Sequence, residues 1–335
     1  MTFDEVIEKT SKPRLLLGNG FSMDYDKKRF SFTSLLELAV KTKIIKKNDL
    51  IFKVFEKLKT SDFESVMKLL NDSVKIIEAY KGDKKLVEKI NEDSEQLKSH
   101  LVNIITNNHP ETSTDIPDAN KKTCVLFLDF FKDIYTLNYD LLLYWATMVD
   151  PLQKFSDGFG ENDYSIHEEH VIYKNKHGGM RVHYLHGGLH IFDAGDEIIK
   201  KTYSKTGVKL VNQIKENLDK NIYPIFISEG DSKQKLTKIL HNSYLNHCYK
   251  SLRSIGGDLV ILGTQLKKND NHILEAIIEN NVENIYIGVV APKSISHIRS
   301  RIDSYNIESK KRYGEKAKKK NLYLYDYRTV NIWGK

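Results

Sequence analysis

The sequence predicts an α/β fold, in which a Rossmann-like, doubly wound and mainly parallel sheet carries a helical insertion. Apolar segments of strand length alternate with segments of helical periodicity, and this alternation is typical of parallel sheets. The first apolar segment ends in a glycine turn, and polar residues directly follow later ones. With 335 residues, of which 40% are hydrophobic, the chain is long enough for one large domain of this kind with an insertion.

The N-terminal part predicts a first strand and then the insertion. Arg14 to Leu17 is a short apolar run that ends at Gly-Asn-Gly, as expected of a parallel strand that leads into a tight turn. Apolar residues then recur at helical spacing, and two prolines predict a loop over residues 107–122. We therefore expect a Rossmann-like core of residues 1–33 and 123–335 and a helical insertion of residues 34–122.

The rest of the core alternates strands and helices. Residues 124–132 are helical or extended and lead into a strand whose C-terminal end carries Asn138 and Asp140. One amphipathic helix is predicted from Ser232 to Ile255. We expect further strands at 133–137, 178–185, 223–228, 258–262, 285–290 and, at a sheet edge, 322–327, and a helix at 272–280.

Composition limits the class of protein. No apolar run approaches the roughly 20 residues of a membrane span, and residues 1–13 lack the apolar stretch of a signal peptide. We therefore expect a cytoplasmic protein without a membrane partner. Cys124 in an apolar strand and Cys248 in a helical pattern build neither a disulfide framework nor a Cys-x-x-Cys zinc site, so we expect both to be buried and expect no metal.

A basic run lies late in the chain. There are 52 basic and 45 acidic residues, which gives a net charge of +7, and residues 310–320 are rich in lysine. Such a run fits either a nucleic-acid surface or a solvated face. The solvated face is the favoured interpretation because the basic residues are not interleaved with aromatic ones. Nucleic-acid binding stays an open alternative.

The glycine turn predicts a phosphate-binding element. Gly18 and Gly20 allow the backbone to approach a phosphate, and Ser22 is placed to cap a helix or to donate to a phosphate oxygen. A dehydrogenase fingerprint would continue to a third glycine, but Met23 stands there, and no acidic residue follows at a second strand end. Hydride transfer is therefore disfavoured. The alternative to a phosphate-binding element is a plain tight turn that binds no ligand.

Asn138, Asp140 and His186 are the candidate catalytic residues. Asn138 and Asp140 lie two apart, so on a strand they point to one side, where they fit a ribose hydroxyl, a water or a carboxamide; an Asx turn is the alternative. His186 fits a base that takes a proton from a hydroxyl or water. Its alternatives are a structural histidine or a metal cluster with His183 and His190, to which His167 and His170 would add. We expect Asn138 and His186 at exposed strand ends, with Gly187 and Gly188 opening a turn.

With these residues laid out, the chain resembles the sirtuin-like superfamily, in its bacterial stand-alone branch. Five motifs agree in order and cover the chain from residue 14 to about 292. The family's Gly-Ala-Gly-Ile-Ser corresponds to 18–22, its Thr-Gln-Asn-Ile-Asp to 136–140, its His-Gly to 186–187, its Phe-Gly-Glu to 226–230 and its Gly-Thr-Ser to 263–265.

The resemblance implies NAD as the ligand and assigns roles to these residues. It places the pyrophosphate on the segment Gly18, Asn19, Gly20, Phe21 and Ser22, and the adenosine half on Gly263, Thr264 and Gln265. It assigns Asn138 to the nicotinamide ribose, Asp140 to the carboxamide and the base role to His186.

Three departures from the family pattern reduce the number of activities that the resemblance implies. Leu137 stands where sirtuins place Gln, the segment between Asp140 and His186 is longer, and the four-cysteine zinc module is missing from the sequence. Protein deacylation is therefore disfavoured. Members without zinc and with a helical insertion resemble effectors of bacterial antiphage systems, which hydrolyse NAD to ADP-ribose and nicotinamide as homo-oligomers or with a partner such as a HerA-type ATPase.

We therefore expect an NAD glycohydrolase that acts in abortive antiphage defence. Two other functions stay open. A sensor or scaffold that binds NAD or ADP-ribose without cleaving it fits Leu137, and a nucleic-acid-directed subunit fits the basic run at 310–320.

Overall fold

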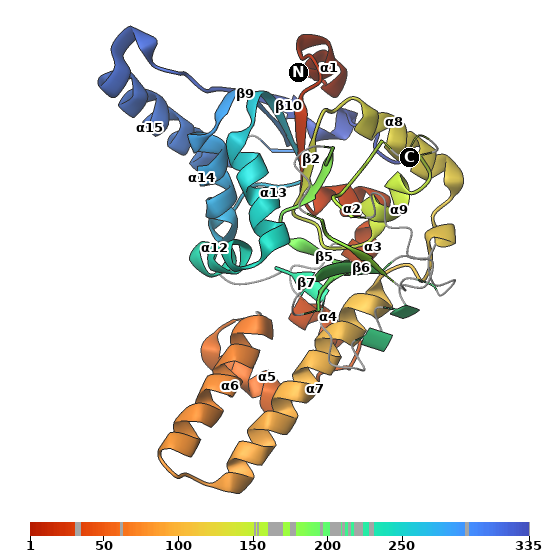
Figure 1. The fold of residues 1–335 in the computed structure, drawn as a ribbon, viewed down its shortest axis with the longest axis vertical. Helices are drawn as coiled ribbons and strands as arrows, with labels where there is room; N and C mark the ends of the chain where they lie inside the picture. Colours follow the sequence, from red (N-terminus) through yellow and green to blue (C-terminus); the bar gives the residue numbers. More distant parts are fainter. Residues whose placement is uncertain are drawn as a thin grey trace.

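A six-stranded parallel sheet forms the centre of the computed structural model (Figure 1), and it confirms the predicted α/β, Rossmann-like fold. Numbered in chain order, its strands lie in the order 6-5-4-1-2-3, which is the Rossmann arrangement. From one edge to the other they are β10 (Asn321–Asp326), β9 (Asn281–Val289), β8 (Gly256–Leu262), β1 (Arg14–Leu17), β2 (Ile134–Thr136) and β4 (Val182–Tyr184). The structure describes residues 1–335 except 31–34, 61–62, 151, 153, 160–169, 175–178, 195–196, 202–208, 210–211, 214–215, 218–223, 228–230, 292–294 and 335.

The central strand β1 is apolar because both faces of the sheet are covered. Leu15, Leu16 and Leu17 are fully buried, and Leu16 is in register with Tyr135 of β2 on one side and Ile261 of β8 on the other. Strand β10 lies at an edge, as the sequence predicts. Every pairing in this sheet is parallel, so the C-terminal ends of its strands share one side.

Helices cover both faces of this sheet. Figure 1 shows α12, α13 and α14 on one side and α2, α8 and α9 on the other. On the first side are α12 (Ser232–His241), α13 (Ser243–Ser254) and α14 (Asn271–Glu279), and on the second are α2 (Gly20–Tyr25), α8 (Asp118–Asp129) and α9 (Leu142–Thr147). Near the ends of the chain lie α1 (Phe3–Lys9) and α15 (Ser296–Tyr313).

The single helix predicted from Ser232 to Ile255 is wrong, because the chain forms two helices there. Asn242 ends α12 in an extended conformation, and its side chain accepts a hydrogen bond from the amide of Leu245 in α13. Asp231 caps α12 in the same way, through the amides of Lys233 and Gln234. An Asn that caps a following helix interrupts the pattern without changing its apolar periodicity.

A second, antiparallel sheet is formed by strands that lie before and after β4 in the chain, and the sequence did not predict it. Its order is β3 (His170–Ile172), β6 (Ile198–Lys201), β5 (Gly187–Asp193) and β7 (Pro224–Phe226). Gly187 and Gly188 were expected to open a turn, but both lie in strand β5. Gly187 has a φ of +74°, and an added Cβ would lie 2.0 Å from the carbonyl oxygen of Ile225, so β5 and β7 approach closely only because this residue is glycine.

The insertion is helical, and its two longest helices form a hairpin that extends away from the sheet (Figure 1). Its helices are α4 (Leu35–Lys41), α5 (Leu50–Leu58), α6 (Phe63–Ala79) and α7 (Lys84–Asn108). The loop predicted over 107–122 is shorter, because α8 begins at Asp118, directly after Pro117. Cys124 therefore lies in a helix and not in a strand, while both it and Cys248 are buried, as predicted.

The basic run at 310–320 is partly structural. Helix α15 ends at Tyr313, and most of the basic residues after Ser309 are exposed. Lys320, however, is buried and donates to the carbonyl oxygens of Asn280 and Val282. Lys318 donates to Asn281. The interpretation as a solvated face is therefore wrong for Lys320, while Lys318 is exposed, and both lysines attach the end of the run to the start of β9. Within the described part of the chain, none of the helices has the length and apolar character to cross a membrane.

Candidate functional site

Two turns meet where the strand order of the parallel sheet reverses, between β1 and β8. Ligands of open α/β sheets bind at such a point, beside the C-terminal ends of the strands. The turn after β1 holds Gly18 and Gly20, and the turn after β8 holds Gly263 and Thr264. The amide of Gly20 donates to the carbonyl oxygen of Gly263 at 2.8 Å. The structure thus brings together the two segments that the sequence assigned to the two halves of NAD.

Close approach explains the glycines of these turns. A Cβ at Gly18 would lie 2.4 Å from the Cβ of Thr264, and a Cβ at Gly20 would lie 2.4 Å from the Cα of Gly263. Gly263 itself has a φ of +74°. Glycine is therefore required here by the packing of one turn against the other, whether or not a phosphate binds.

The other predicted residues of these turns differ in exposure. Asn19 and Gln265 are exposed, and the side-chain amide of Asn19 donates to the carbonyl oxygen of Phe30. Phe21 is fully buried and packs on Trp333, with ring centroids 5.0 Å apart. Its side chain therefore belongs to the core, whereas Asn19 and Gln265 present exposed side chains from this pair of turns.

Ser22, Asn138 and Asp140 form one buried hydrogen-bonded cluster. The Ser22 hydroxyl donates to Oδ2 of Asp140 at 2.5 Å, and Nδ2 of Asn138 donates to the same hydroxyl at 2.8 Å. Ser22 comes from α2 and the other two from the segment after β2, so the two predicted motifs lie side by side. Both side chains reach Ser22, but from the segment after β2 and not from the strand itself, so the strand geometry predicted for them is wrong. Oδ1 of Asp140 accepts the amide of Leu142 two residues on, which is the Asx turn given as the alternative.

Asp140 is a carboxylic acid held away from water. It is 8% exposed, and burial raises its pKa above the usual value. Hydrogen bonds from Ser22 and from the amide of Leu142 act in the opposite direction, because they favour the carboxylate. Asn138 is 7% exposed, so the expectation of an exposed strand end is wrong for this residue. The second sheet covers this edge, and its residue Leu189 donates to the carbonyl oxygen of Tyr139.

His186 lies beside this cluster, in the turn between β4 and β5. It is 3% exposed, so it too is buried and not at an exposed strand end. Burial lowers the pKa of His186 well below its usual value, the charge of Lys235 lowers it further, and a hydrogen bond to the backbone of Leu137 raises it. The imidazole is therefore neutral at physiological pH, which is the state that a general base needs.

The other histidines of the predicted cluster point elsewhere. The ring of His183 stacks on Tyr135 and that of His190 on Tyr144, each with centroids 4.6 Å apart. His170 lies in β3, and His167 lies outside the described residues. Within the residues that the structure describes, no group of three or more His, Cys, Asp or Glu side chains is arranged to hold a metal ion.

The sequence analysis did not identify two residues of the site, His272 and Ser232. Nε2 of His186 lies 3.3 Å from Nε2 of His272, and Nδ1 of His272 lies 3.3 Å from Oγ of Ser232. His272 was placed only in a predicted helix. A polar residue at the buried start of an apolar helix, as in His272-Ile273-Leu274, was the available signal, but its partner on a distant turn could not be read from local pattern.

The chain matches the model of a domain family of unknown function, DUF4917, over residues 15–333. The chain belongs to this family. The match includes both glycine turns, the segment 136–140 and His186, so the DUF4917 domain comprises the sheet, the insertion and the site together. No curated protein matches the chain.

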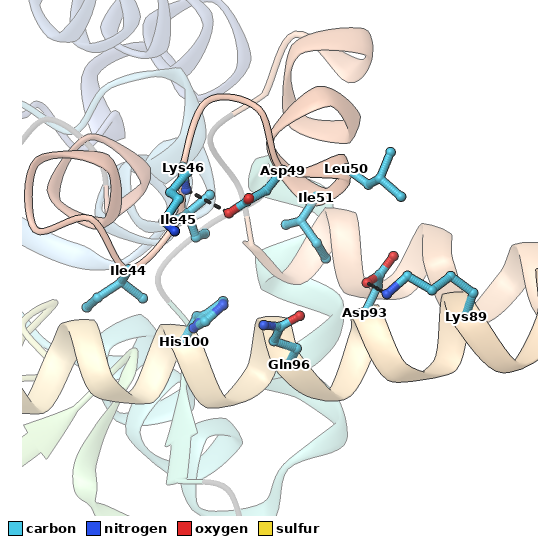
Figure 2. Close-up of a pocket in the computed structure, with 10 residues that line it drawn as sticks. All are labelled: Ile44, Ile45, Lys46, Asp49, Leu50, Ile51, Lys89, Asp93, Gln96 and His100. Atoms are coloured by element: carbon cyan, nitrogen blue, oxygen red, sulfur yellow. Dashed lines mark hydrogen bonds and ion pairs between the residues drawn. The ribbon is translucent and has the colours of Figure 1, made fainter.

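The DUF4917 domain also has a pocket in its insertion. Figure 2 shows it between the segment 44–51 and helix α7, with a volume of about 330 Å³. Both carboxylates of its lining have a partner there: Asp93 pairs with Lys89 at 2.9 Å, and Asp49 accepts the backbone amide of Lys46 at 2.7 Å. None of the lining residues is among the predicted site residues, so this pocket is separate from the strand-end site.

Proposed function

We propose that this protein is an NAD glycohydrolase, which cleaves NAD to ADP-ribose and nicotinamide. The observation that supports this most is the Ser22 hydroxyl, which joins Asn138 and Asp140 next to the reversal point of a Rossmann sheet. A serine after a glycine turn and an Asn-x-Asp segment are the elements by which the sequence resembles NAD-consuming enzymes. A buried carboxyl, a buried amide and a neutral imidazole in one region suit work on a glycosidic bond.

The chemistry requires positioning and a base more than an acid. Nicotinamide leaves as a neutral molecule from a cationic precursor, so its departure needs no proton. The C1 atom of the ribose develops an oxocarbenium-like charge and is captured by water. In this scheme Asn138 holds the ribose, Asp140 holds the carboxamide, and His186 takes the proton of the attacking water or of a ribose hydroxyl. The low pKa of His186 keeps the imidazole neutral at neutral pH, and the same burial makes it a weaker base than a free imidazole.

NAD would lie across the two joined turns. The diphosphate fits near Gly18 and Gly20 and the adenosine half near Gly263 and Thr264. Since the amide of Gly20 is bonded to Gly263, we expect exposed groups of the turns, such as Asn19 and Gln265, to contact the ligand.

A second candidate is a sensor or scaffold that binds NAD or ADP-ribose without cleavage. Leu137 replaces a polar ribose contact of the resembled enzymes, and the polar groups of Asn138 and Asp140 already bond to Ser22. Such a protein would bind NAD and release no nicotinamide.

One experiment separates these candidates. The purified full-length chain is incubated with NAD, nicotinamide and ADP-ribose are measured by chromatography, and NAD binding is measured by calorimetry on the inactive His186→Gln variant. Nicotinamide release supports hydrolysis, binding without release supports the sensor, and neither result supports a ligand other than NAD. A parallel assay with a strong chelator tests the expectation that no metal is needed.

The role in defence is a separate part of the proposal. We propose that the protein works in the bacterial cytoplasm, as a homo-oligomer or with a HerA-type ATPase or another defence partner, and depletes NAD during phage infection. Cells that express the wild type should lose NAD after infection and limit phage yield, whereas cells that express His186→Gln should do neither. Equal phage yield from both would reject the role in defence without bearing on the hydrolysis measured in vitro.

A further inference from the structure

Two histidines and a serine form a continuous line behind His186. The rings of His186 and His272 are stacked, with centroids 5.5 Å apart and an interplanar angle of 25°, and their Nε2 atoms are 3.3 Å apart. Nδ1 of His272 then faces the hydroxyl of Ser232 at 3.3 Å. The same hydroxyl accepts the backbone amide of His272 at 2.7 Å, which fixes the serine at the start of α12 against the start of α14.

The protons of His186, His272 and Ser232 can be placed in two arrangements that satisfy these hydrogen bonds. A neutral imidazole has one N–H donor and one acceptor nitrogen, so in each contact one partner donates and the other accepts. In the first arrangement His186 donates from Nε2 to His272, and His272 donates from Nδ1 to Ser232, which leaves the Nδ1 lone pair of His186 as a base. In the second, Ser232 donates to His272, His272 donates from Nε2 to His186, and the proton of His186 is on Nδ1.

The groups around His186 and His272 favour transfer of a proton along these residues over its retention on either imidazole. Lys235 of α12 places a positive charge near both imidazoles, while Asp270 pairs with Lys235 at 2.9 Å and acts on His272 in the opposite direction. From α13, the Tyr249 hydroxyl donates to the backbone carbonyl of His272. The backbone carbonyl of Leu137 can only accept a hydrogen bond, so it favours the second arrangement, in which His186 carries its proton on the nitrogen that does not face His272. At the far end of the line Ser232 is only half-buried, so a proton that reaches it can pass to water.

We propose that His186, His272 and Ser232 form a proton relay that removes the proton taken up during NAD cleavage. This inference rests on the proposed hydrolysis, in which the bond between C1 and the nicotinamide nitrogen breaks, its electron pair leaves with nicotinamide, and the water oxygen bonds to C1. The water proton goes to Nδ1 of His186, the Nε2 proton of His186 goes to Nε2 of His272, and the Nδ1 proton of His272 goes to Ser232. The Ser232 hydroxyl proton leaves to solvent, so one proton enters, one leaves, and no charge stays on the relay.

His272 and Ser232 are thus positioning residues that act through His186. The first test compares His272→Gln and Ser232→Ala with the control Tyr249→Phe, which removes a bond to the His272 backbone but leaves the relay atoms. We expect kcat to fall about 10- to 100-fold in the two relay variants with KM within about twofold, since the substrate does not touch them. The pH profile of kcat and its solvent isotope effect should change in both relay variants and stay unchanged in Tyr249→Phe. Wild-type kcat and pH profile in His272→Gln would overturn the relay.

The second test needs no activity. The protein is labelled with ¹⁵N-histidine, and two-bond ¹H–¹⁵N spectra at pH 7 report which ring nitrogen carries each proton. We expect His272→Gln to shift the tautomer ratio of His186 and Tyr249→Phe to leave it unchanged. An unchanged His186 tautomer in His272→Gln would overturn the relay even if NAD is cleaved. If the tautomers are coupled but the wild type releases no nicotinamide, the NAD reaction is rejected and the hydrogen-bonded relay is retained.

Discussion

The hydroxyl of Ser22 donates to the carboxylate of Asp140 at 2.5 Å, although 118 residues separate them in the chain. This bond joins the first helix after β1 to the segment after β2. Without it, Oδ2 of Asp140 would lose its serine donor in a buried position, while Oδ1 would keep the bond from the amide of Leu142.

Substitution of this pair should show strong coupling. In a double-mutant cycle of Ser22→Ala and Asp140→Ala, we expect an interaction free energy of about 1–3 kcal/mol in urea unfolding, because a buried group is left unpaired in each single variant. The control is the exposed pair Lys75 and Asp72, for which coupling should be near zero. Additive effects in the Ser22–Asp140 cycle would show that the bond does not form in solution.

Loss of His186 or Asn138 should abolish NAD cleavage. We expect His186→Gln and Asn138→Ala to lower nicotinamide release by about 10²-fold or more, as for loss of a positioned base or ribose contact. Because both residues are buried, melting temperature must be measured alongside. The control His183→Gln changes another buried histidine that stacks on Tyr135, and it should keep activity. Full activity in both site variants would reject this site.

Addition of one methyl group at Gly18 should disturb the joined turns. A Cβ there would lie 2.4 Å from the Cβ of Thr264, so one turn must move, and we expect Gly18→Ala to cost roughly 1–3 kcal/mol in unfolding free energy. Gly314→Ala is the control, because no atom lies within 4 Å of its added Cβ, although its φ of +58° gives a cost of about 1 kcal/mol. Equal melting temperatures for Gly18→Ala and the wild type would contradict the packing of the two turns.

Acid should destabilise the fold before the carboxylates are protonated. Burial lowers the pKa of His272 and His183 to about 3 and that of His109 to about 4. Their unfolded values lie near 6.5, so below about pH 6.5 the unfolded chain binds more protons than the folded one, and stability falls as the pH falls toward 4. Urea unfolding at pH 7, 6 and 5 measures this. The dependence should weaken in His183→Gln, and a flat profile would contradict buried neutral histidines.

The basic run should divide into two functional parts. Neutralisation of the exposed Lys310, Lys311, Arg312 and Lys319 should change solubility but neither NAD turnover nor stability. Lys320→Gln should destabilise the fold, because it removes the bonds to Asn280 and Val282. Filter binding to duplex DNA at two salt concentrations tests the alternative. Tight binding that falls steeply with salt, and that the four substitutions remove, would assign the run to nucleic acid.

Lys320 should make the free energy of unfolding depend on pH in the alkaline range. Burial lowers its pKa to about 8 from the usual 10.5. Between these values the unfolded chain binds more protons than the folded one, so this residue makes stability rise as the pH rises from 8 toward 10.5. The slope of unfolding free energy against pH in that window should be smaller in Lys320→Gln than in the wild type.

The local sequence pattern was sufficient to predict the parallel sheet and the residues that lie in the turns after its strands. Strands β1 and β8 are buried on both faces, so they appear as short apolar runs, and the residues that follow them lie together because parallel strands end on one side. Ser22 and Asp140 could be placed near each other on that ground alone.

The features that could not be predicted from the sequence depend on contacts between distant segments of the chain. Strand β5 begins with two glycines, which indicate a turn locally, but β7 pairs with it and makes Gly187 part of a sheet. That sheet buries Asn138 and His186, so their exposure was misjudged. His272 was missed for a related reason, since its importance comes from a ring 86 positions earlier in the chain.

The joined turns also set the order in which the site can exist during synthesis. The turn after β1 is made early, but Gly20 has its partner only at Gly263, and His186 meets His272 later still. A nascent chain that has not yet extended past these residues holds Ser22, Asn138 and Asp140 without the turn that packs against Gly18 and Gly20. Translation products that stop before residue 263 therefore have no assembled site.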